Sequence, residues 1–215
     1  MDMGYLAGID LGTSSVKVLI MDPDGRTLAV SSRGYDVMTP KMSYAEQEPQ
    51  VWWDCTVMAI REAMEKSGIR PEELDGIGLS GQMHGLVAFD RNNEPVMPAI
   101  IWMDQRSAKE TALIKELAGD LLETELLNQP GAGMMICSLL WLKRHRPDVY
   151  DRIAHVMLPK DYIRYRLTGT IGSDFSDACA TLAFSVKGRC WCMELIRRAG
   201  LKEDIWSQVG ESSQA

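Results

Sequence analysis

The sequence of 215 residues has no hydrophobic run that approaches the length of a membrane-spanning helix. Its N-terminus has no basic segment ahead of the first apolar stretch, and Asp10 interrupts that stretch, so no targeting segment is indicated. The five cysteines are scattered, and no pair has the two-residue spacing of a zinc site or suggests a disulfide framework. We therefore expect a cytoplasmic protein with no membrane partner.

The chain also has fewer basic residues than acidic residues. The chain has 23 Lys and Arg residues against 30 Asp and Glu residues, a formal net charge of -7, and no basic stripe is visible. A nucleic-acid partner is therefore not expected, because its phosphate backbone requires clustered basic side chains. The remaining composition, 46% hydrophobic and 25% charged, is that of an ordinary globular protein with one or two domains.

The most informative stretch is the sequence Asp-Leu-Gly-Thr-Ser-Ser at residues 10–15, which lies between two apolar runs of strand length. This pattern predicts the tip of a β-hairpin and not the glycine turn that opens a helix in the common nucleotide-binding loops. Gly12 lets the backbone approach a ligand closely, and Thr13 and Ser14 add hydroxyl donors to the turn amides. Such a turn suits a polyphosphate.

Two charged residues flank this turn. Asp10 would repel phosphate oxygens, so its expected role is to hold a magnesium ion beside them through water. Lys17 adds a positive charge nearby. The alternative interpretation is that Asp10 and Thr13 only satisfy a tight turn, as these residue types do in most hairpins.

The hydrophobic pattern beyond the turn predicts a mixed α/β sheet. A helix is expected over residues 50–66 with Gly68 just beyond its end, and residues 106–166 are expected to be mainly helical. No linker, repeat or low-complexity segment separates these parts. Further strands or short apolar runs are expected at residues 26–35, 74–80, 86–90 and 98–102.

The glycine pattern at residues 76–81 matches the G-x-G-x-x-G signature of dinucleotide-binding proteins. Polar residues precede it where a strand is required, and a strand-like run follows it where a helix is required. We therefore interpret these glycines as a strand end that lets a ligand approach closely.

The polar cluster that follows this strand is the second candidate site, because binding residues gather at such exits. Gln82 and His84 can hydrogen-bond sugar hydroxyls, and Met83 offers an adaptable apolar wall to the carbon face of a sugar. The alternative is a satisfied core histidine beside a buried methionine, since the chain has 14 methionines.

At this point the sequence resembles the FGGY carbohydrate kinases and, within them, the xylulokinases. The likeness covers most of the chain and depends on six ordered motifs. They are Gly-Ile-Asp-Leu-Gly-Thr-Ser-Ser-Val-Lys at 8–17, Glu-Gln-Glu-Pro at 46–49 followed by Trp52-Trp53, Gly-Gln-Met-His-Gly at 81–85, Pro-Ala-Ile-Ile-Trp-Met-Asp-Gln-Arg at 98–106, Leu-Pro-Lys-Asp-Tyr at 158–162 and Ser-Asp-Phe-Ser-Asp-Ala at 173–178.

The resemblance implies an α/β fold of the actin-like, ribonuclease-H-like class, with a mixed sheet flanked by helices and with ATP and sugar meeting between two domains. It implies that Asp10 lies by magnesium and the phosphates and that Met83 and His84 contact a ketopentose. The sugar side would be lined further by Trp102, Asp104 and Arg106. The implied reaction is ATP-dependent phosphorylation of D-xylulose to D-xylulose 5-phosphate. The alternatives are a related kinase for gluconate or another pentulose, and an actin-like or heat-shock-type ATPase module.

Two departures from the family pattern matter. Ser138 stands where the family signature has a lysine, which leaves the choice of sugar open. The family's Gly-Gly-Gly-Asp motif, whose aspartate acts as general base, does not occur in the 215 residues. We therefore expect residues 1–215 to be an incomplete N-terminal domain without the adenosine-binding domain, inactive alone, and prone to self-association, for example as a homodimer.

Overall fold

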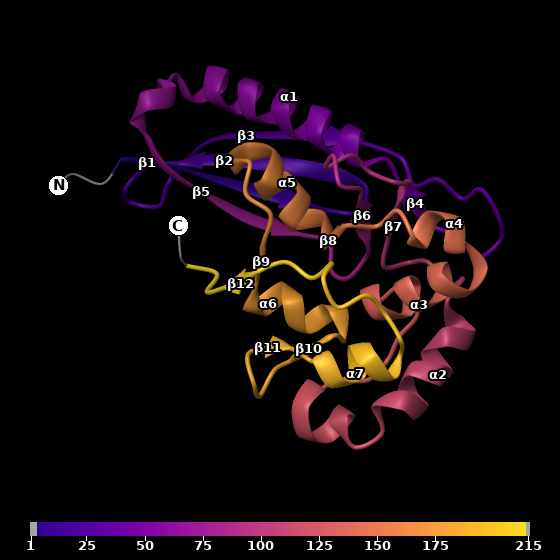
Figure 1. The fold of residues 1–215 in the computed structure, drawn as a ribbon. Coiled ribbons are helices and arrows are strands. Elements are labelled where there is room, and N and C mark those ends of the chain that lie inside the picture. The colour runs from indigo at the N-terminus through magenta and orange to yellow at the C-terminus, as the bar shows by residue number, and fades with distance from the viewer. Residues whose placement is uncertain (1–3, 214–215) are drawn as a thin grey trace. The chain divides into compact units, whose positions relative to one another are not determined.

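The computed structural model describes residues 4–213 and divides the chain into two compact units. The first unit comprises Met1–Val37 and Glu48–Gln82, and the second comprises Met38–Gln47 and Met83–Ala215. Figure 1 labels the elements of both units. Across the described part of the chain, every helix is too short or too polar to cross a membrane.

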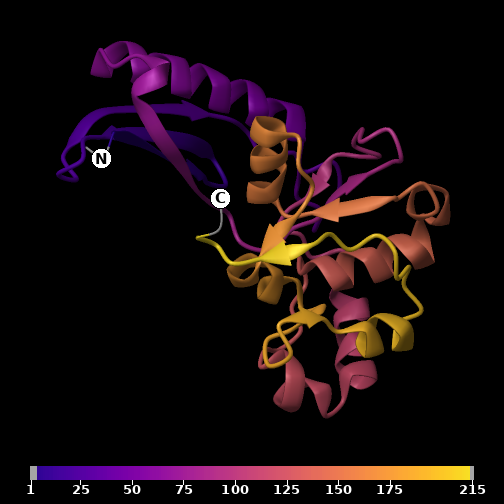
Figure 2. The same cartoon turned by 60° about the vertical axis from the view of Figure 1, so that its left-hand side comes forward.

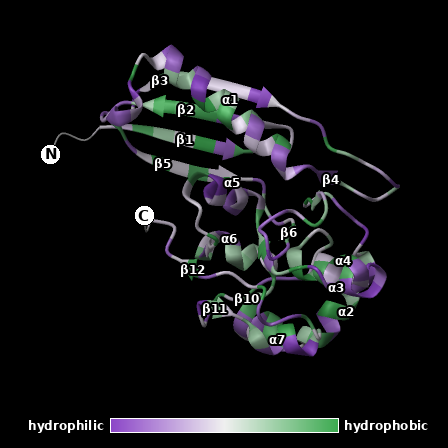
Figure 3. Cartoon of the chain, turned by 45° about the horizontal axis from the view of Figure 1, so that its top comes forward, coloured by the Kyte–Doolittle hydropathy of each residue, from purple (hydrophilic) through white to green (hydrophobic). Residues whose placement is uncertain are grey.

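The first unit is built on one mixed sheet with the strand order β3-β2-β1-β5. Strands β1 and β2 are antiparallel, β2 and β3 are antiparallel, and β5 is parallel to β1. Alternate residues of β1 and β2 are buried, and β2 carries the hydrophobic colour in Figure 3. The strands are β1 (Tyr5–Leu11), β2 (Ser15–Met21), β3 (Thr27–Gly34) and β5 (Leu74–Gly81).

Helix α1 (Pro49–Ser67) lies along one face of this sheet and packs on β2 and β3 (Figure 2). Pro49 occupies its first position, where the missing N–H costs nothing. The helix ends at Gly68, whose φ of 71° allows its N–H to donate to the Met64 carbonyl. Its buried residues recur every three or four positions, as an amphipathic helix requires. The helix predicted over residues 50–66 is therefore confirmed.

The glycine pattern at residues 76–81 lies inside β5, between the short 3₁₀ helix η1 (Pro71–Glu73) and the loop that follows Gly81. Gly78 is paired with Gly8 across the parallel ladder. No helix starts in this segment, so its interpretation as a strand and not as a dinucleotide-binding turn is confirmed.

The second unit combines four two-stranded ladders with helices. Its core includes Leu86 and Ile100 from the strand segments, Ile114 from α2, Leu139 from α3 and Ile196 from α7, all buried. The paired strands are β4 (Glu46–Gln47) with β7 (Ala99–Ile100), β6 (Val87–Phe89) with β8 (His155–Met157), β9 (Ser173–Asp174) with β12 (Val209–Gly210), and β10 (Phe184–Ser185) with β11 (Cys190–Trp191).

The helices of this unit up to residue 168 follow the helical pattern predicted for residues 106–166, whereas the later helices were not predicted. The exception is β8, which interrupts the expected helical region with three residues paired to β6. A strand this short has too few residues to show a period of two. The helices are α2 (Ala108–Ala118), η2 (Leu122–Leu126), α3 (Met135–His145), α4 (Pro147–Tyr150), α5 (Pro159–Thr168), α6 (Phe175–Ala178), η3 (Cys179–Thr181) and α7 (Met193–Arg198).

Candidate functional site

The candidate phosphate turn in the first unit is a tight hairpin tip between β1 and β2, as the sequence predicts. The Gly12 amide donates to the Ser15 carbonyl at 3.0 Å. A Cβ atom on residue 12 would lie 3.0 Å from the same carbonyl oxygen, so only glycine fits without a shift. Thr13 is half-buried and Ser14 is exposed at the tip. The turn can therefore present backbone amides and hydroxyls to an anion.

Tyr35, which the sequence analysis did not single out, follows the last residue of β3 and hydrogen-bonds to this turn. Its hydroxyl donates to the Gly12 carbonyl at 2.7 Å, and its amide donates to the Ser14 carbonyl at 3.0 Å. Burial raises the pKa of the Tyr35 hydroxyl well above its ordinary value, so the group stays protonated and remains a donor. The turn conformation is thus stabilised by a residue from outside the hairpin.

Asp10 lies near the end of β1 with an exposed side chain. It is paired in register with Lys17 on β2 and with Ser80 on β5, and the Ser80 hydroxyl donates to Asp10 Oδ1 at 2.9 Å. An exposed carboxylate is the kind of oxygen ligand that magnesium takes, directly or through water. The donor set at this strand end therefore fits a magnesium ion held by Asp10.

The predicted sugar segment begins at Gln82, the last residue of the first unit, which is buried and donates its amide to the Leu11 carbonyl at 2.6 Å. In the second unit, the Met83 side chain is 55% exposed and His84 is half-buried. His84 has a φ of 56°, a left-handed conformation that is uncommon for residues other than glycine and is concentrated at functional sites. Its Nδ1 lies 2.7 Å from the Ala180 carbonyl oxygen.

Gly133 connects the His84 segment with the Trp102 segment. Its carbonyl accepts a hydrogen bond from the Gly85 amide at 3.2 Å, and its φ is 83°. A Cβ atom on residue 133 would collide with the Trp102 carbonyl. The backbone approach therefore requires glycine, and the Trp102 side chain, 37% exposed, is held beside this contact.

Asp104 and Arg106 form a buried ion pair. The Arg106 Nη2 lies 2.7 Å from Asp104 Oδ2 and 2.7 Å from Glu46 Oε1, and Asp104 Oδ2 also accepts from the Ala45 amide at 2.7 Å. The Arg106 guanidinium lies 3.8 Å from the Tyr44 ring centroid.

The side chains of Asp104 and Arg106 are almost fully buried, at 0% and 2% exposed. Burial alone would lower the pKa of Arg106, but hydrogen bonds to Asp104 and Glu46 raise it above its ordinary value. These contacts stabilise the loop that carries Trp102. Direct sugar contact by Asp104 and Arg106 stays a prediction.

Ser138 lies inside α3 and is fully buried. Its hydroxyl has no hydrogen-bond partner among the residues that the structure describes. A lysine at this position would bury a positive charge in the same surroundings, which costs several kcal/mol unless it is paired. Serine buries no charge here, although its unpaired hydroxyl is itself unfavourable in these surroundings.

The structure brings the sequence-predicted residues into two groups, one in each unit. Asp10, Gly12, Thr13, Ser14 and Lys17 gather at one hairpin. In the second unit, His84 and Trp102 belong to segments that Gly133 joins. The supporting residues Tyr35, Ser80 and Gly133 were missed, because each acts through a contact distant in sequence. Only the Gly-Ala-Gly run at 131–133 carried a signal for one of them.

Comparison with known proteins places these features in one family. The profile of the N-terminal domain of the FGGY family of carbohydrate kinases matches residues 5–215. The xylulose kinase of Bacillus subtilis (strain 168) is 36% identical over 210 residues, covering 98% of this chain and 42% of that protein. The chain thus spans less than half the length of this curated relative.

Solved structures of carbohydrate kinases are also similar to this chain. A crystal structure described as a xyloylose kinase from Brucella ovis is 35% identical, with a TM-score of 0.91 over 98% of this chain and 44% of its own. A gluconate kinase from Lactobacillus acidophilus is 26% identical, with a TM-score of 0.88 over 96% of this chain and 42% of its own. The likeness confirms the predicted actin-like class of α/β fold. The chain belongs to the FGGY family of carbohydrate kinases.

Proposed function

We propose that the full gene product transfers the γ-phosphoryl group of ATP to the 5-hydroxyl of D-xylulose. The observation that carries the proposal is the presence, in one chain, of a phosphate-type turn beside an exposed aspartate and of exposed Met83 and Trp102 side chains near a strained His84. The 36% identity to the xylulose kinase of Bacillus subtilis, in a match that covers 98% of this chain, supports the choice of sugar.

In this proposal the first unit binds the phosphates. The amides and hydroxyls at Gly12, Thr13 and Ser14 hydrogen-bond phosphate oxygens, and Lys17 offsets their charge. Asp10 holds magnesium, directly or through water. A magnesium ion held there would supply positive charge to offset the charge that develops on the transferred phosphoryl group.

The second unit contributes most of the sugar contacts. Met83 and Trp102 cover the carbon face of the ketopentose, and His84 hydrogen-bonds one of its hydroxyls. Gln82, at the end of the first unit, adds an amide. Asp104 and Arg106 act by fixing the loop on which Trp102 stands.

The reaction itself is a single displacement. The sugar hydroxyl oxygen bonds to the γ-phosphorus, the bond to the β-phosphate oxygen breaks, and ADP leaves. The hydroxyl proton passes to a general base. The Gly-Gly-Gly-Asp aspartate that the family resemblance names for this role does not occur among the 215 residues. The proposal therefore assigns no base within them and expects residues 1–215, assayed alone, to lack sugar kinase activity.

A second candidate is a kinase for gluconate, which the similarity to the gluconate kinase of Lactobacillus acidophilus favours. Ser138 in place of the signature lysine also separates this chain from the family pattern on the sugar side. Both candidates share the same phosphate chemistry and differ only in the acceptor.

The test is a coupled ADP-release assay of the full gene product with ATP, magnesium and, in parallel, D-xylulose, other pentuloses and gluconate. We expect the highest kcat/KM with D-xylulose, and a 31P spectrum that places the product phosphate on the 5-oxygen. Higher kcat/KM with gluconate would select the second candidate. Sugar-independent ATP hydrolysis would contradict both and favour a mechanical ATPase.

A further inference from the structure

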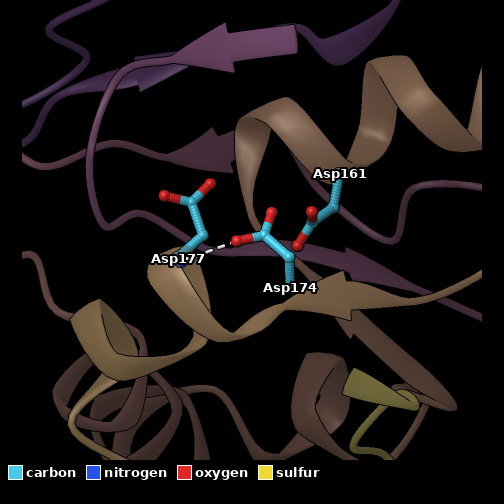
Figure 4. Close-up of side chains that lie close together, drawn as sticks. All are labelled: Asp161, Asp174 and Asp177. Carbon is cyan, nitrogen blue, oxygen red and sulfur yellow. Dashed lines mark hydrogen bonds between the residues drawn. The ribbon is translucent and has the colours of Figure 1, made fainter. Parts of the chain in front are cut away.

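Lys160, the second residue of α5, lies among three carboxylates of the second unit. Its Nζ contacts Asp161 Oδ1 at 3.6 Å and Asp177 Oδ2 at 3.3 Å, and it donates a short hydrogen bond to Asp174. Figure 4 shows the three aspartates converging from α5, β9 and α6. The Lys160 side chain is only 10% exposed. The cluster is therefore an internal charge network and not a surface ion pair.

The three carboxylates are close enough to hold a metal ion, with ligand oxygens within 4.8 Å of one another. The Lys160 ammonium already supplies the positive charge at this place. Although burial opposes it, the pKa of Lys160 is raised above its ordinary value by Asp161, Asp174 and Asp177. Lys160 thus offsets part of the negative charge of the three carboxylates and occupies the position between them, and we assign the cluster no metal.

The network continues from Asp174 to the candidate sugar site. Asp174 caps α6, accepting hydrogen bonds from the Ser176 amide at 2.9 Å and the Asp177 amide at 3.3 Å. Helix α6 runs directly into η3, whose Ala180 carbonyl lies 2.7 Å from His84 Nδ1. The charge network and the imidazole are therefore joined by one short, capped helical segment.

A second contact joins α5 to the His84 segment directly. Pro159, the residue before Lys160, packs against the residue after His84: a Cβ atom on Gly85 would lie 3.3 Å from Pro159 Cγ. The first turn of α5 therefore touches the His84 segment through Pro159 and the Ala180 segment through Lys160. A shift between α5 and α6 would change the distance from Ala180 to His84.

The contact with Ala180 also fixes the hydrogen on the imidazole. A backbone carbonyl can only accept, so Nδ1 must carry the hydrogen when this bond forms. In the neutral ring, Nε2 then presents a lone pair and accepts a hydrogen bond. A sugar hydroxyl that meets Nε2 must therefore act as a donor.

We propose that Lys160 is a positioning residue for sugar recognition: by binding Asp174 and Asp177 it holds the Ala180 carbonyl against His84 and keeps Nε2 as the acceptor. The inference rests on the proposed function, since it assumes that His84 binds the sugar. Its direct consequence is that loss of Lys160 weakens sugar binding although Lys160 itself touches no ligand.

The test compares Lys160→Met and Lys160→Arg with Lys202→Met in the full gene product. Lys202 is a matched control, because its Nζ also makes partly buried structural contacts, with the carbonyls of Tyr150, Asp151 and Ile153. We expect Lys160→Met to raise the KM for D-xylulose by about tenfold, as the loss of one oriented hydrogen bond implies, with the KM for ATP unchanged. Lys160→Arg keeps the charge and should recover part of the loss, whereas Lys202→Met should leave both KM values unchanged.

The spectroscopic measurement is a long-range 1H–15N correlation of the histidine rings, with the His84 signals identified by their loss in His84→Gln. We expect wild-type His84 to be protonated on Nδ1 and Lys160→Met to shift it toward the Nε2-protonated form. Should Lys160→Met fail to fold, Asp174→Asn weakens the same network and should shift the spectrum in the same direction.

Two results are distinguishable. If Lys160→Met keeps the wild-type ring pattern and a D-xylulose KM within about twofold of wild type, the positioning role is overturned while the kinase proposal stands. If His84→Gln itself leaves sugar binding unchanged, the proposed sugar role of His84 fails first, and the positioning role of Lys160 fails with it.

Discussion

Asp10 and Asp104 lie in the two regions to which sequence motifs assign ligand binding, yet their surroundings are opposite. Asp10, beside the hairpin turn, is exposed and accepts one hydrogen bond from Ser80 at Oδ1. Asp104, in the loop after Trp102, is fully buried, and both of its oxygens accept hydrogen bonds from Arg106 or the Ala45 amide.

The difference predicts that one motif carboxylate serves a ligand and the other serves the fold, according to the burial and the partners of each. An exposed carboxylate is hydrated and can exchange water for a cation. A buried carboxylate whose oxygens are already paired would have to break those bonds, at a cost of several kcal/mol, before it could bind a substrate. Substitution of Asp104 should therefore change mainly the free energy of unfolding, and substitution of Asp10 should change mainly turnover.

The largest effect is expected for Asp104→Asn. Removing this charge leaves Arg106 buried opposite Glu46 alone, so the free energy of unfolding should fall by about 3–5 kcal/mol. Urea denaturation followed by tryptophan fluorescence measures it. Asp148→Asn is the matched control: its pair with Arg146 is exposed, so its loss should leave the free energy of unfolding close to that of the wild type. Unchanged stability with weakened sugar binding would instead assign Asp104 to the substrate.

Asp10→Asn should have the opposite effect: it should lower turnover and leave stability nearly unchanged. Turnover by the full gene product should fall at least ~100-fold, about 2.7 kcal/mol of transition-state stabilisation, and the magnesium requirement should rise. Stability should stay close to that of the wild type, because the side chain is exposed. Asp24→Asn, in the exposed turn after β2, is the control and should leave turnover unchanged. Near-wild-type turnover for Asp10→Asn would remove Asp10 from the phosphate site.

The same contrast explains how much could be predicted from the sequence. The hairpin, β3, α1 and β5 follow from periodicity, turn residues and the glycine at the helix end, which are all local signals. The hairpin turn between β1 and β2 was therefore placed correctly, whereas its binding of phosphate stays a prediction. The short strands β6 and β7 lie in the apolar runs predicted at 86–90 and 98–102, whereas β8 was missed because it lies inside a region whose pattern is otherwise helical.

The surroundings of the site residues could not be predicted, because they depend on contacts between distant parts of the chain. Nothing near Arg106 in the sequence indicates that Glu46 and Tyr44 will enclose it. Likewise, the Ala180 carbonyl reaches His84 across 96 residues. Residue types can be assigned to a site from motifs, whereas their burial requires the tertiary structure.

His84→Ala tests the second region directly. Loss of the ring should raise the KM for D-xylulose by the equivalent of about 1–3 kcal/mol, because a sugar hydroxyl loses its partner, with the KM for ATP nearly unchanged. His155→Ala, on β8, serves as the control for losing a partly buried histidine in the same unit. An equal rise in the KM for D-xylulose and the KM for ATP, together with a lowered Tm, would instead identify His84 as a core residue.

The smallest effect is expected for Tyr35→Phe, which removes only the hydroxyl that donates to the Gly12 carbonyl at 2.7 Å. The turn keeps its own bond from Gly12 to Ser15, so the loss should cost about 0.5–1.5 kcal/mol of stability. Because the affected carbonyl belongs to the phosphate turn, the KM for ATP should rise slightly while the KM for D-xylulose stays constant. Tyr165→Phe, in the second unit, controls for loss of a tyrosine hydroxyl and should leave the KM for ATP unchanged. A rise in the sugar KM alone would contradict the assignment of this turn to the nucleotide and would remove the contrast between the two regions.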